Sequence, residues 1–329
     1  MAKTLFSVRE VSEMIQSGKI LVVTGEEKLL QQLPKGKWIG GTIPYFMTEE
    51  KGGVCEKDLL FVNDFTKYAK NVNTATFNEA NLKNLAKDGF ENGFNFIIIP
   101  ATQPVHMKFA IEGSNFEKLY LNPLVGFVAG VDLNEIGKVT PKVFNGADAS
   151  MHEKEAVVMH VELEKGKTGK LSIINIFNQD EDSSSITFPV SGFSAKECMV
   201  NGQSLLLADY IAINEIDTKL PLVADYMGAQ INICIESIDP ETKYVNFLAP
   251  VFEGTVYKHA ESLGNYKQTF NDSIPKHLTN ESIVYSCNCI LNYVHGGLEG
   301  EKIALNGSMT FGEIAYKLLN QTFVYLTIE

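Results

Sequence analysis

The sequence has 329 residues and a net charge of -12, and only one of its 28 basic residues, Arg9, is an arginine. Binding to nucleic acid or to an anionic membrane surface requires clustered cations, so this composition argues against both kinds of partner. The length exceeds the usual size of a single core and 45% of the residues are hydrophobic, so two domains with sizeable cores are expected.

The cysteines indicate a reducing compartment. Five are present, an odd number that is low for this length, which is typical of free thiols rather than a disulfide framework. The amino terminus lacks the apolar core of a signal peptide, and no run approaches the ~20 apolar residues that span a bilayer. We therefore expect a soluble cytoplasmic protein.

The amino-terminal region predicts alternating short helices and buried strands. Apolar residues recur at helical spacing over 7–17, where Ser7 is followed by Glu10 in the pattern of a capping box. Further along, we expect a strand at 20–25, a helix at 26–33, a strand at 37–47 that contains Gly41 and Thr42, and a strand at 58–65.

The same alternation of helices and buried strands continues through the middle of the chain. Helices are predicted at 77–93 and 106–121, buried strands at 94–104 and 122–133, and two strands at 156–177. The order of buried strand, helix and glycine-bearing strand occurs near 20–65, again near 96–163, and in a shortened form at 283–328. This recurrence indicates a degenerate structural repeat, which predicts pseudo-symmetric lobes facing a common cleft.

The second half predicts mostly strands. Asn201-Gly202 lies between two strand-like runs and is the strongest hairpin signal, because both central positions of a type I′ turn need positive φ. Three more strands follow around a turn at 239–241, and 257–270 is predicted to be helical. The whole pattern predicts an α+β protein in two lobes of mixed, largely antiparallel sheets covered by helices.

Segments of the carboxy-terminal half resemble FIST domains, which are intracellular sensory modules for small ligands. The segments that carry the resemblance are CMVNGQSLLLADYI, LPLVADYMGAQINICIESIDPE, VNFLAPVFEGTVY, IVYSCNC and NGSMTFGEIAYKLLNQT. The amino-terminal half is similar chiefly through LPKGKWIGGTIPYFM and NPLVGFVAGVDL. The resemblance implies a FIST N-like lobe at 1–195 and a FIST C-like lobe at 196–329.

The sequence departs from the FIST pattern at the expected ligand end. Members commonly carry an arginine shortly after Ser-Cys, whereas Asn288, Cys289 and Ile290 stand here. We recognise no kinase, cyclase, receiver or helix-turn-helix region within the 329 residues. The resemblance therefore implies either a stand-alone binder or a sensor that acts through a signalling partner protein.

Polar residues gather where apolar strands end in the stretch from Ser282 to Glu329, which is typical of a binding site. We expect a small-molecule ligand to be bound by Gly41, Thr42, Ser286, Cys287, Asn288, Gly307, Thr310 and Glu313. Because a carboxylate is present and arginine is nearly absent, the favoured ligand is a small polar metabolite, neutral or cationic, such as an amino acid. The alternative for Glu313 is a helix cap for 313–319.

Other chemistries stay open at this point. Cys287 with His295 could serve a hydrolase or transferase, and Cys287 with Cys289 could face one side of a strand as a redox pair or soft-metal site. No second cysteine pair completes a zinc site, so no metal is predicted. No cofactor is predicted either. A haem-binding sensor would need an axial ligand such as His106, His160 or His259. A structural interaction protein without any small ligand is a further alternative.

Overall fold

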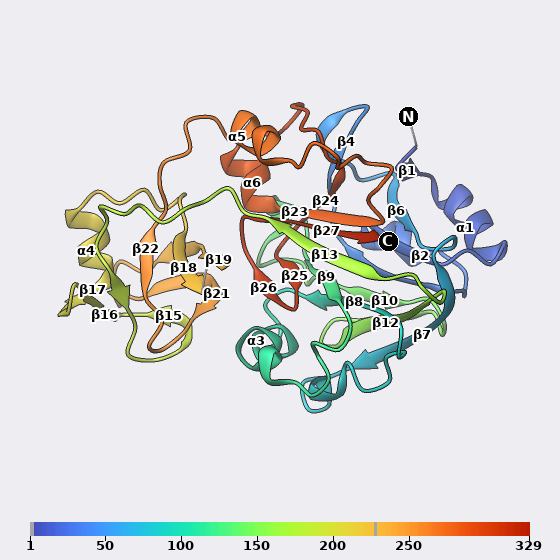
Figure 1. Cartoon of the computed structure of the whole chain (residues 1–329), viewed down its shortest axis with the longest axis horizontal. Helices are drawn as coiled ribbons and strands as arrows, with labels where there is room; N and C mark the ends of the chain where they lie inside the picture. The colour runs from blue at the N-terminus through green and yellow to red at the C-terminus, as the bar shows by residue number, and fades with distance from the viewer. Residues whose placement is uncertain (1–2, 227–228) are drawn as a thin grey trace. The chain divides into compact units, whose positions relative to one another are not determined.

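The chain forms two compact units (Figure 1) in a computed structural model that describes residues 3–226 and 229–329. Unit 1 contains the described residues up to Ile174, together with Ile274–Leu318 and Phe323–Glu329. Unit 2 contains the described residues of Asn175–Ser273 together with Leu319–Thr322. The predicted division between 195 and 196 differs from this arrangement, because the last strands of the chain pair with strands of the amino-terminal part.

Three six-stranded sheets build unit 1. Sheet A has the order β1 (Leu5–Phe6), β6 (Leu60–Asp64), β2 (Leu21–Gly25), β3 (Trp38–Thr42), β10 (Val143–Asn145) and β11 (Ser150–His152). Sheet B has the order β13 (Gly169–Ile174), β27 (Phe323–Ile328), β23 (Tyr285–Cys289), β24 (Gly307–Thr310), β4 (Tyr45–Thr48) and β5 (Gly52–Cys55). Sheet C has the order β26 (Lys317–Leu319), β25 (Glu313–Ala315), β9 (Leu124–Ala129), β8 (Gly93–Pro100), β12 (Ala156–Leu163) and β7 (Ala69–Phe77).

Unit 2 is built from antiparallel sheets. Its larger sheet has the order β17 (Gln203–Leu206), β16 (Glu197–Val200), β14 (Ile186–Thr187), β22 (Tyr257–His259), β18 (Leu222–Tyr226) and β19 (Ala229–Ile233). The smaller sheet has the order β15 (Gly192–Ala195), β21 (Val245–Val251) and β20 (Ile235–Ile238). The predicted hairpin at Asn201-Gly202 is confirmed, since it joins β16 to β17 and both residues have positive φ.

The helices are short. They are α1 (Val8–Gln16), α2 (Glu27–Leu30), α3 (Pro104–Glu112), α4 (Leu207–Ile213), α5 (Tyr266–Ser273) and α6 (Ile290–His295), with 3₁₀ turns at Leu82–Asn84, Gly113–Asn115 and Leu133–Glu135. The capping box predicted for α1 is confirmed: Ser7 Oγ accepts from the Glu10 backbone N–H, and the Ser7 N–H donates to the Glu10 carboxylate. None of the helices formed by the described residues has the length and apolar character needed to cross a membrane.

The α+β prediction is confirmed, and so is the recurring strand-helix-strand order. Each of the pairs β2/β3, β8/β9 and β23/β24 is parallel and contains a helix in its connection. Such crossovers are what adjacent parallel strands require. All three of these strand pairs lie in unit 1, however, so the repeat does not generate the two lobes.

Two predicted helices are wrong. In 77–93 only the 3₁₀ turn at Leu82–Asn84 forms, because Asn78 Oδ1 accepts from the N–H groups of Ala80 and Asn81 and so competes with a helix. In 257–270 the first residues form β22, which pairs with both β14 and β18, and α5 begins only after the break at Gly264. Tertiary pairing overrides local spacing there.

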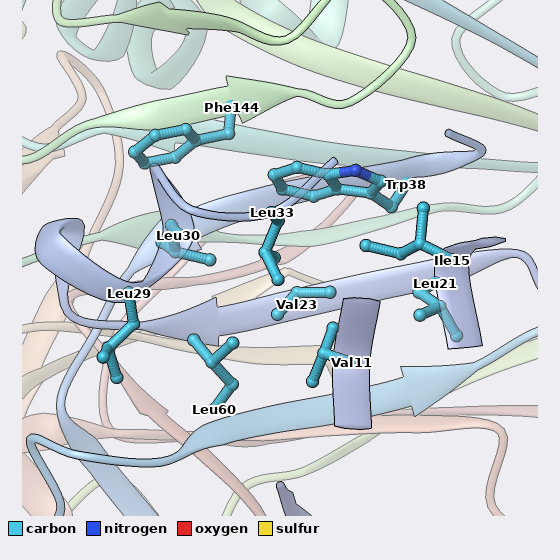
Figure 2. Packing of buried hydrophobic residues seen from close by; sticks show 10 residues of the cluster. All are labelled: Val11, Ile15, Leu21, Val23, Leu29, Leu30, Leu33, Trp38, Leu60 and Phe144. Carbon is cyan, nitrogen blue, oxygen red and sulfur yellow. The ribbon is translucent and has the colours of Figure 1, made fainter. Parts of the chain in front are cut away.

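A compact apolar cluster lies between α1, α2 and sheet A (Figure 2). Its members are Val11, Ile15, Leu21, Val23, Leu29, Leu30, Leu33, Trp38, Leu60 and Phe144. The Trp38 and Phe144 rings stack with centroids 6.4 Å apart, and the indole N–H donates to the Pro34 carbonyl at 2.8 Å. The cluster thus fixes β2 and β3, whose carboxyl ends enter the site described below.

Replacing Phe144 with alanine should reduce the free energy of unfolding by about 3–5 kcal/mol, because a buried ring is lost and a cavity remains beside Trp38. Urea unfolding followed by the fluorescence of Trp38, the single tryptophan, measures this loss. Ile173→Ala, at a half-exposed position, is the control and should change stability by under ~0.5 kcal/mol. Equal losses for the two variants would contradict the assignment of Phe144 to the core.

Candidate functional site

The predicted residues near the carboxyl terminus lie in the interior of unit 1. The parallel strands β23 and β24 place Cys287 opposite Ser308 and Cys289 opposite Thr310. The side chains of Cys287, Thr310 and Glu313 are all fully buried. The structure therefore brings Cys287, Thr310 and Glu313 together, but in the core rather than at an open surface.

Hydrogen bonds give this buried group a structural role. The Thr310 hydroxyl lies 3.1 Å from the Gly312 carbonyl and 3.4 Å from Glu313 Oε1. Asn288 Oδ1 accepts from the Cys289 N–H and from Asn292 Nδ2, both at 2.8 Å, and so holds the first turn of α6 against β23. The helix-cap alternative for Glu313 is wrong, because Glu313–Ala315 is strand β25.

The environment of Cys287 opposes nucleophilic chemistry. Burial raises the pKa of its thiol far above the ordinary value, and the nearby Glu313 carboxylate raises it further. Reactive cysteines instead need a lowered pKa and solvent access. His295 lies at the exposed end of α6, whereas Cys287 has no exposed surface. The geometry therefore does not support the hydrolase or transferase alternative.

The predicted glycines serve close packing. A Cβ on Gly41 would lie 2.7 Å from the Ile98 side chain and 3.1 Å from Phe127, so the glycine lets β3 approach sheet C. A Cβ on Gly307 would lie 2.8 Å from the Ser286 carbonyl oxygen. Both glycines are explained by this packing.

A pocket opens where β2, β3 and β9 end. Its cavity volume is about 260 Å³, and it is lined by Gly25, Glu26, Glu27, Lys28, Gln31, Thr42, Ile43, Pro44, Gly130, Val131, Asp132, Glu135, Val139 and Thr140. Thr42 is the predicted site residue that reaches it. We call this cavity the carboxyl-end pocket.

Acidic residues outnumber lysines in the lining of the carboxyl-end pocket. Four of its lining residues are acidic and Lys28 is its lysine. Lys57 Nζ lies 2.6 Å from Asp132 Oδ2, and the Asn134 N–H donates to Asp132 Oδ1 at 2.8 Å. These contacts, Lys57 first, lower the pKa of Asp132 to about 2, so this carboxylate is charged at neutral pH. Burial raises the pKa of Glu26.

A buried lysine contacts two lining residues of the carboxyl-end pocket. Lys142 Nζ lies 2.7 Å from Glu27 Oε2 and 3.5 Å from Glu153 Oε1, while its side chain is only 10% exposed. Its backbone N–H donates to Thr42 Oγ1 at 2.9 Å. Lys142 therefore orients Glu27 and Thr42 together.

The prediction missed most of this pocket. Glu26 directly follows the buried strand β2, and Asp132 follows β9 after two residues. Polar residues after the carboxyl ends of parallel strands are a known position for ligand sites. The signal was therefore present, but finding it required knowing that β2 pairs with β3 in parallel.

Ser286 lies in a different hollow. A groove of about 610 Å³ is lined by Lys3, Thr4, Lys19, Glu49, Phe61, Val62, Asn63, Asp64, Thr66, Lys67, Tyr68, Asn280, Glu281, Ile283, Val284, Ser286 and Asn306. The Ser286 hydroxyl donates to the Asn306 carbonyl at 2.7 Å. The predicted site thus divides among the core, this groove and the carboxyl-end pocket.

One protein family matches nearly the whole chain. A family of unknown function, DUF6976, matches residues 6–329. The chain belongs to the DUF6976 family. No curated protein matches it. Membership in DUF6976 extends over both units and assigns no reaction or ligand to either.

The histidines considered as haem ligands are buried side chains. His160 Nδ1 lies 2.7 Å from Asn95 Oδ1 between β12 and β8, and His106 Nδ1 lies 3.3 Å from the Thr102 backbone nitrogen. His259 is buried in unit 2. Across the residues that the structure describes, no group of three or more His, Cys, Asp or Glu side chains could hold a metal ion.

Alkylation with iodoacetamide at mildly alkaline pH should modify Cys55 well before Cys287. Burial raises the pKa of both thiols, but Cys55 is partly exposed, whereas Cys287 has no accessible surface. Peptide mapping by mass spectrometry follows each site over time, and labelling in urea gives the unprotected rate. Faster labelling of Cys287 than of Cys55 in the folded protein would restore the cysteine-enzyme alternative.

His106 should make the protein less stable as the pH falls. Burial lowers its pKa from 6.5 to about 4, so between these values the unfolded chain binds more protons than the folded one. The loss from this group should reach up to about 3 kcal/mol as the pH decreases from 6.5 to 4. In urea unfolding, His106→Asn should flatten this pH dependence and His277→Asn, at an exposed position, should not. Identical pH slopes for His106→Asn and wild type would contradict the assignment.

Proposed function

We propose that this DUF6976 protein binds a small polar metabolite in the carboxyl-end pocket and acts as a non-catalytic sensory or ligand-binding protein in the cytoplasm. The ligand is neutral or cationic and amino-acid-like, and a signalling partner protein receives the output. The observation that supports the proposal is a cavity at the carboxyl ends of β2, β3 and β9 with four carboxylates in its wall.

The charge of the wall favours a ligand with an ammonium group. Asp132 is ionised at neutral pH and paired with Lys57. Burial and the charge of Glu135 raise the pKa of Glu26, whereas Lys57 lowers it. An ammonium group placed among these carboxylates would relieve like-charge repulsion and donate charge-assisted hydrogen bonds. A phosphate or a second carboxylate would meet repulsion instead. A volume of about 260 Å³ suits a ligand of amino-acid size.

The sensory part of the proposal rests on the FIST resemblance. That resemblance implies intracellular detection of a small molecule without catalysis. The raised pKa of the Cys287 thiol is compatible with a protein that binds without reacting, and the five free cysteines are compatible with a reducing compartment.

A thermal-stability screen against amino acids, amines and uncharged metabolites tests the proposal. A ligand present at about 100 times its Kd should stabilise the folded state by about 2.7 kcal/mol and raise the melting temperature by roughly 5 °C. A ligand with an ammonium group should give the largest rise. If no ligand of any class raises the melting temperature, the binding proposal fails.

Matched carboxylate variants locate the site. Glu26→Gln and Glu135→Gln each remove one charge from the carboxyl-end pocket. Each should therefore lower the affinity for a ligand with an ammonium group about tenfold. Isothermal titration calorimetry measures the change. Glu49→Gln, which lies on the separate groove, is the control and should leave the affinity unchanged. A loss as large in Glu49→Gln as in the pocket variants would place the ligand elsewhere.

A further inference from the structure

The longest described strand of the protein is also an edge strand. β7 extends over nine residues, Ala69–Phe77, and pairs only with β12 at the end of sheet C (Figure 1). No other strand formed by the described residues is bonded to its outer side. A strand edge of this length presents a row of backbone donors and acceptors that can pair with another strand.

The usual protective features occupy only one end of β7. Lys70 is its single charged residue and pairs with Glu162 at 2.8 Å, and the register with β12 shifts between Glu162 and Leu163. Beyond that irregularity, Asn71–Phe77 is paired in continuous register with β12. This seven-residue stretch, NVNTATF, contains no charge, proline or glycine. The register shift is a β-bulge at the Lys70 end of β7. It leaves Asn71–Phe77 as the stretch whose outer edge can pair with another strand.

The limits of this stretch define how two copies would pair. An isologous antiparallel pair that uses all seven positions has its two-fold axis at the central residue, Thr74. In that register Val72 faces Thr76 of the second copy and Thr74 faces its own equivalent. Asn73 faces Ala75. The first two contacts join β-branched side chains, which are favourable cross-strand neighbours.

Among the ways in which two copies could meet, this edge is the one that charge opposes least. Two molecules that each carry a net charge of -12 repel one another over most approaches. Along Asn71–Phe77 no ionised side chain opposes the approach, and the neighbouring Lys70 is already paired with Glu162. We propose that the protein forms a two-fold homodimer in which β7 of each copy pairs antiparallel about Thr74, extending sheet C across both molecules.

Cysteine cross-linking tests the register in the full chain. Thr74→Cys should form an intermolecular disulfide on oxidation, because directly opposed Cα atoms lie about 4.5–5.5 Å apart. Asn73→Cys is the matched control and should not form one, since the two substituted positions would be about 7–8 Å apart across the two-fold axis. Wild-type protein gives the background from its own cysteines. Equal cross-linking of the two variants would overturn the register.

Charge variants test the interface without relying on oxidation. Wild-type protein should be a dimer by size-exclusion chromatography with light scattering. Asn73→Glu combined with Ala75→Glu places carboxylates opposite each other and should give a monomer, whereas Asn73→Lys combined with Ala75→Glu should keep the dimer. Circular dichroism and melting temperature confirm that both variants fold. A monomeric wild type, or a dimer that both variants leave intact, would overturn the proposal.

Discussion

Unit 1 depends on the return of the last strands of the chain into sheets begun by the first half. β24 pairs with β4, β25 with β9, and β27 with β13. The Phe311 N–H donates to the Val128 carbonyl, and the Val128 N–H donates to the Gly312 carbonyl, so the end of β9 is fixed from both directions. The Phe311 ring occupies the space that a side chain at Gly130 would need. The shape of the carboxyl-end pocket is thus set by residues that lie far away in the sequence.

Polar residues follow the carboxyl ends of the parallel strand pairs, but they line a cavity at one pair and are buried at another. At β2 and β3 the strand ends meet solvent, so Glu26 and Thr42 line a cavity. At β23 and β24 the corresponding ends are covered, so Asn288 and Thr310 make their hydrogen bonds to α6 and to the neighbouring backbone. Polar residues at the ends of parallel strands therefore line a candidate binding site at β2 and β3, and they hold neighbouring elements together at β23 and β24.

Local signals predicted several local features correctly, although helical spacing alone was wrong over 77–93 and 257–270. The capping box at Ser7, the Asn201-Gly202 hairpin and the strand-helix-strand order each depend on neighbours within a short stretch of sequence. The site was predicted less well, because burial of Cys287 and Glu313 depends on strands paired across the whole chain. Polar residues at strand ends indicate a site only when the ends are open, and one sequence does not reveal which ends are covered.

The pairing of the last strands also constrains how the chain acquires its structure during synthesis. Strands β4, β9 and β13 emerge from the ribosome long before β24, β25 and β27 exist to cover them. Until then they present unpaired edges, which are the usual starting points of aggregation. The nascent chain must keep these three edges apart from one another while unit 2 is being made. Sheet completion is therefore a late and strongly non-local step, and slow synthesis of the carboxy-terminal strands would lengthen the interval of greatest exposure.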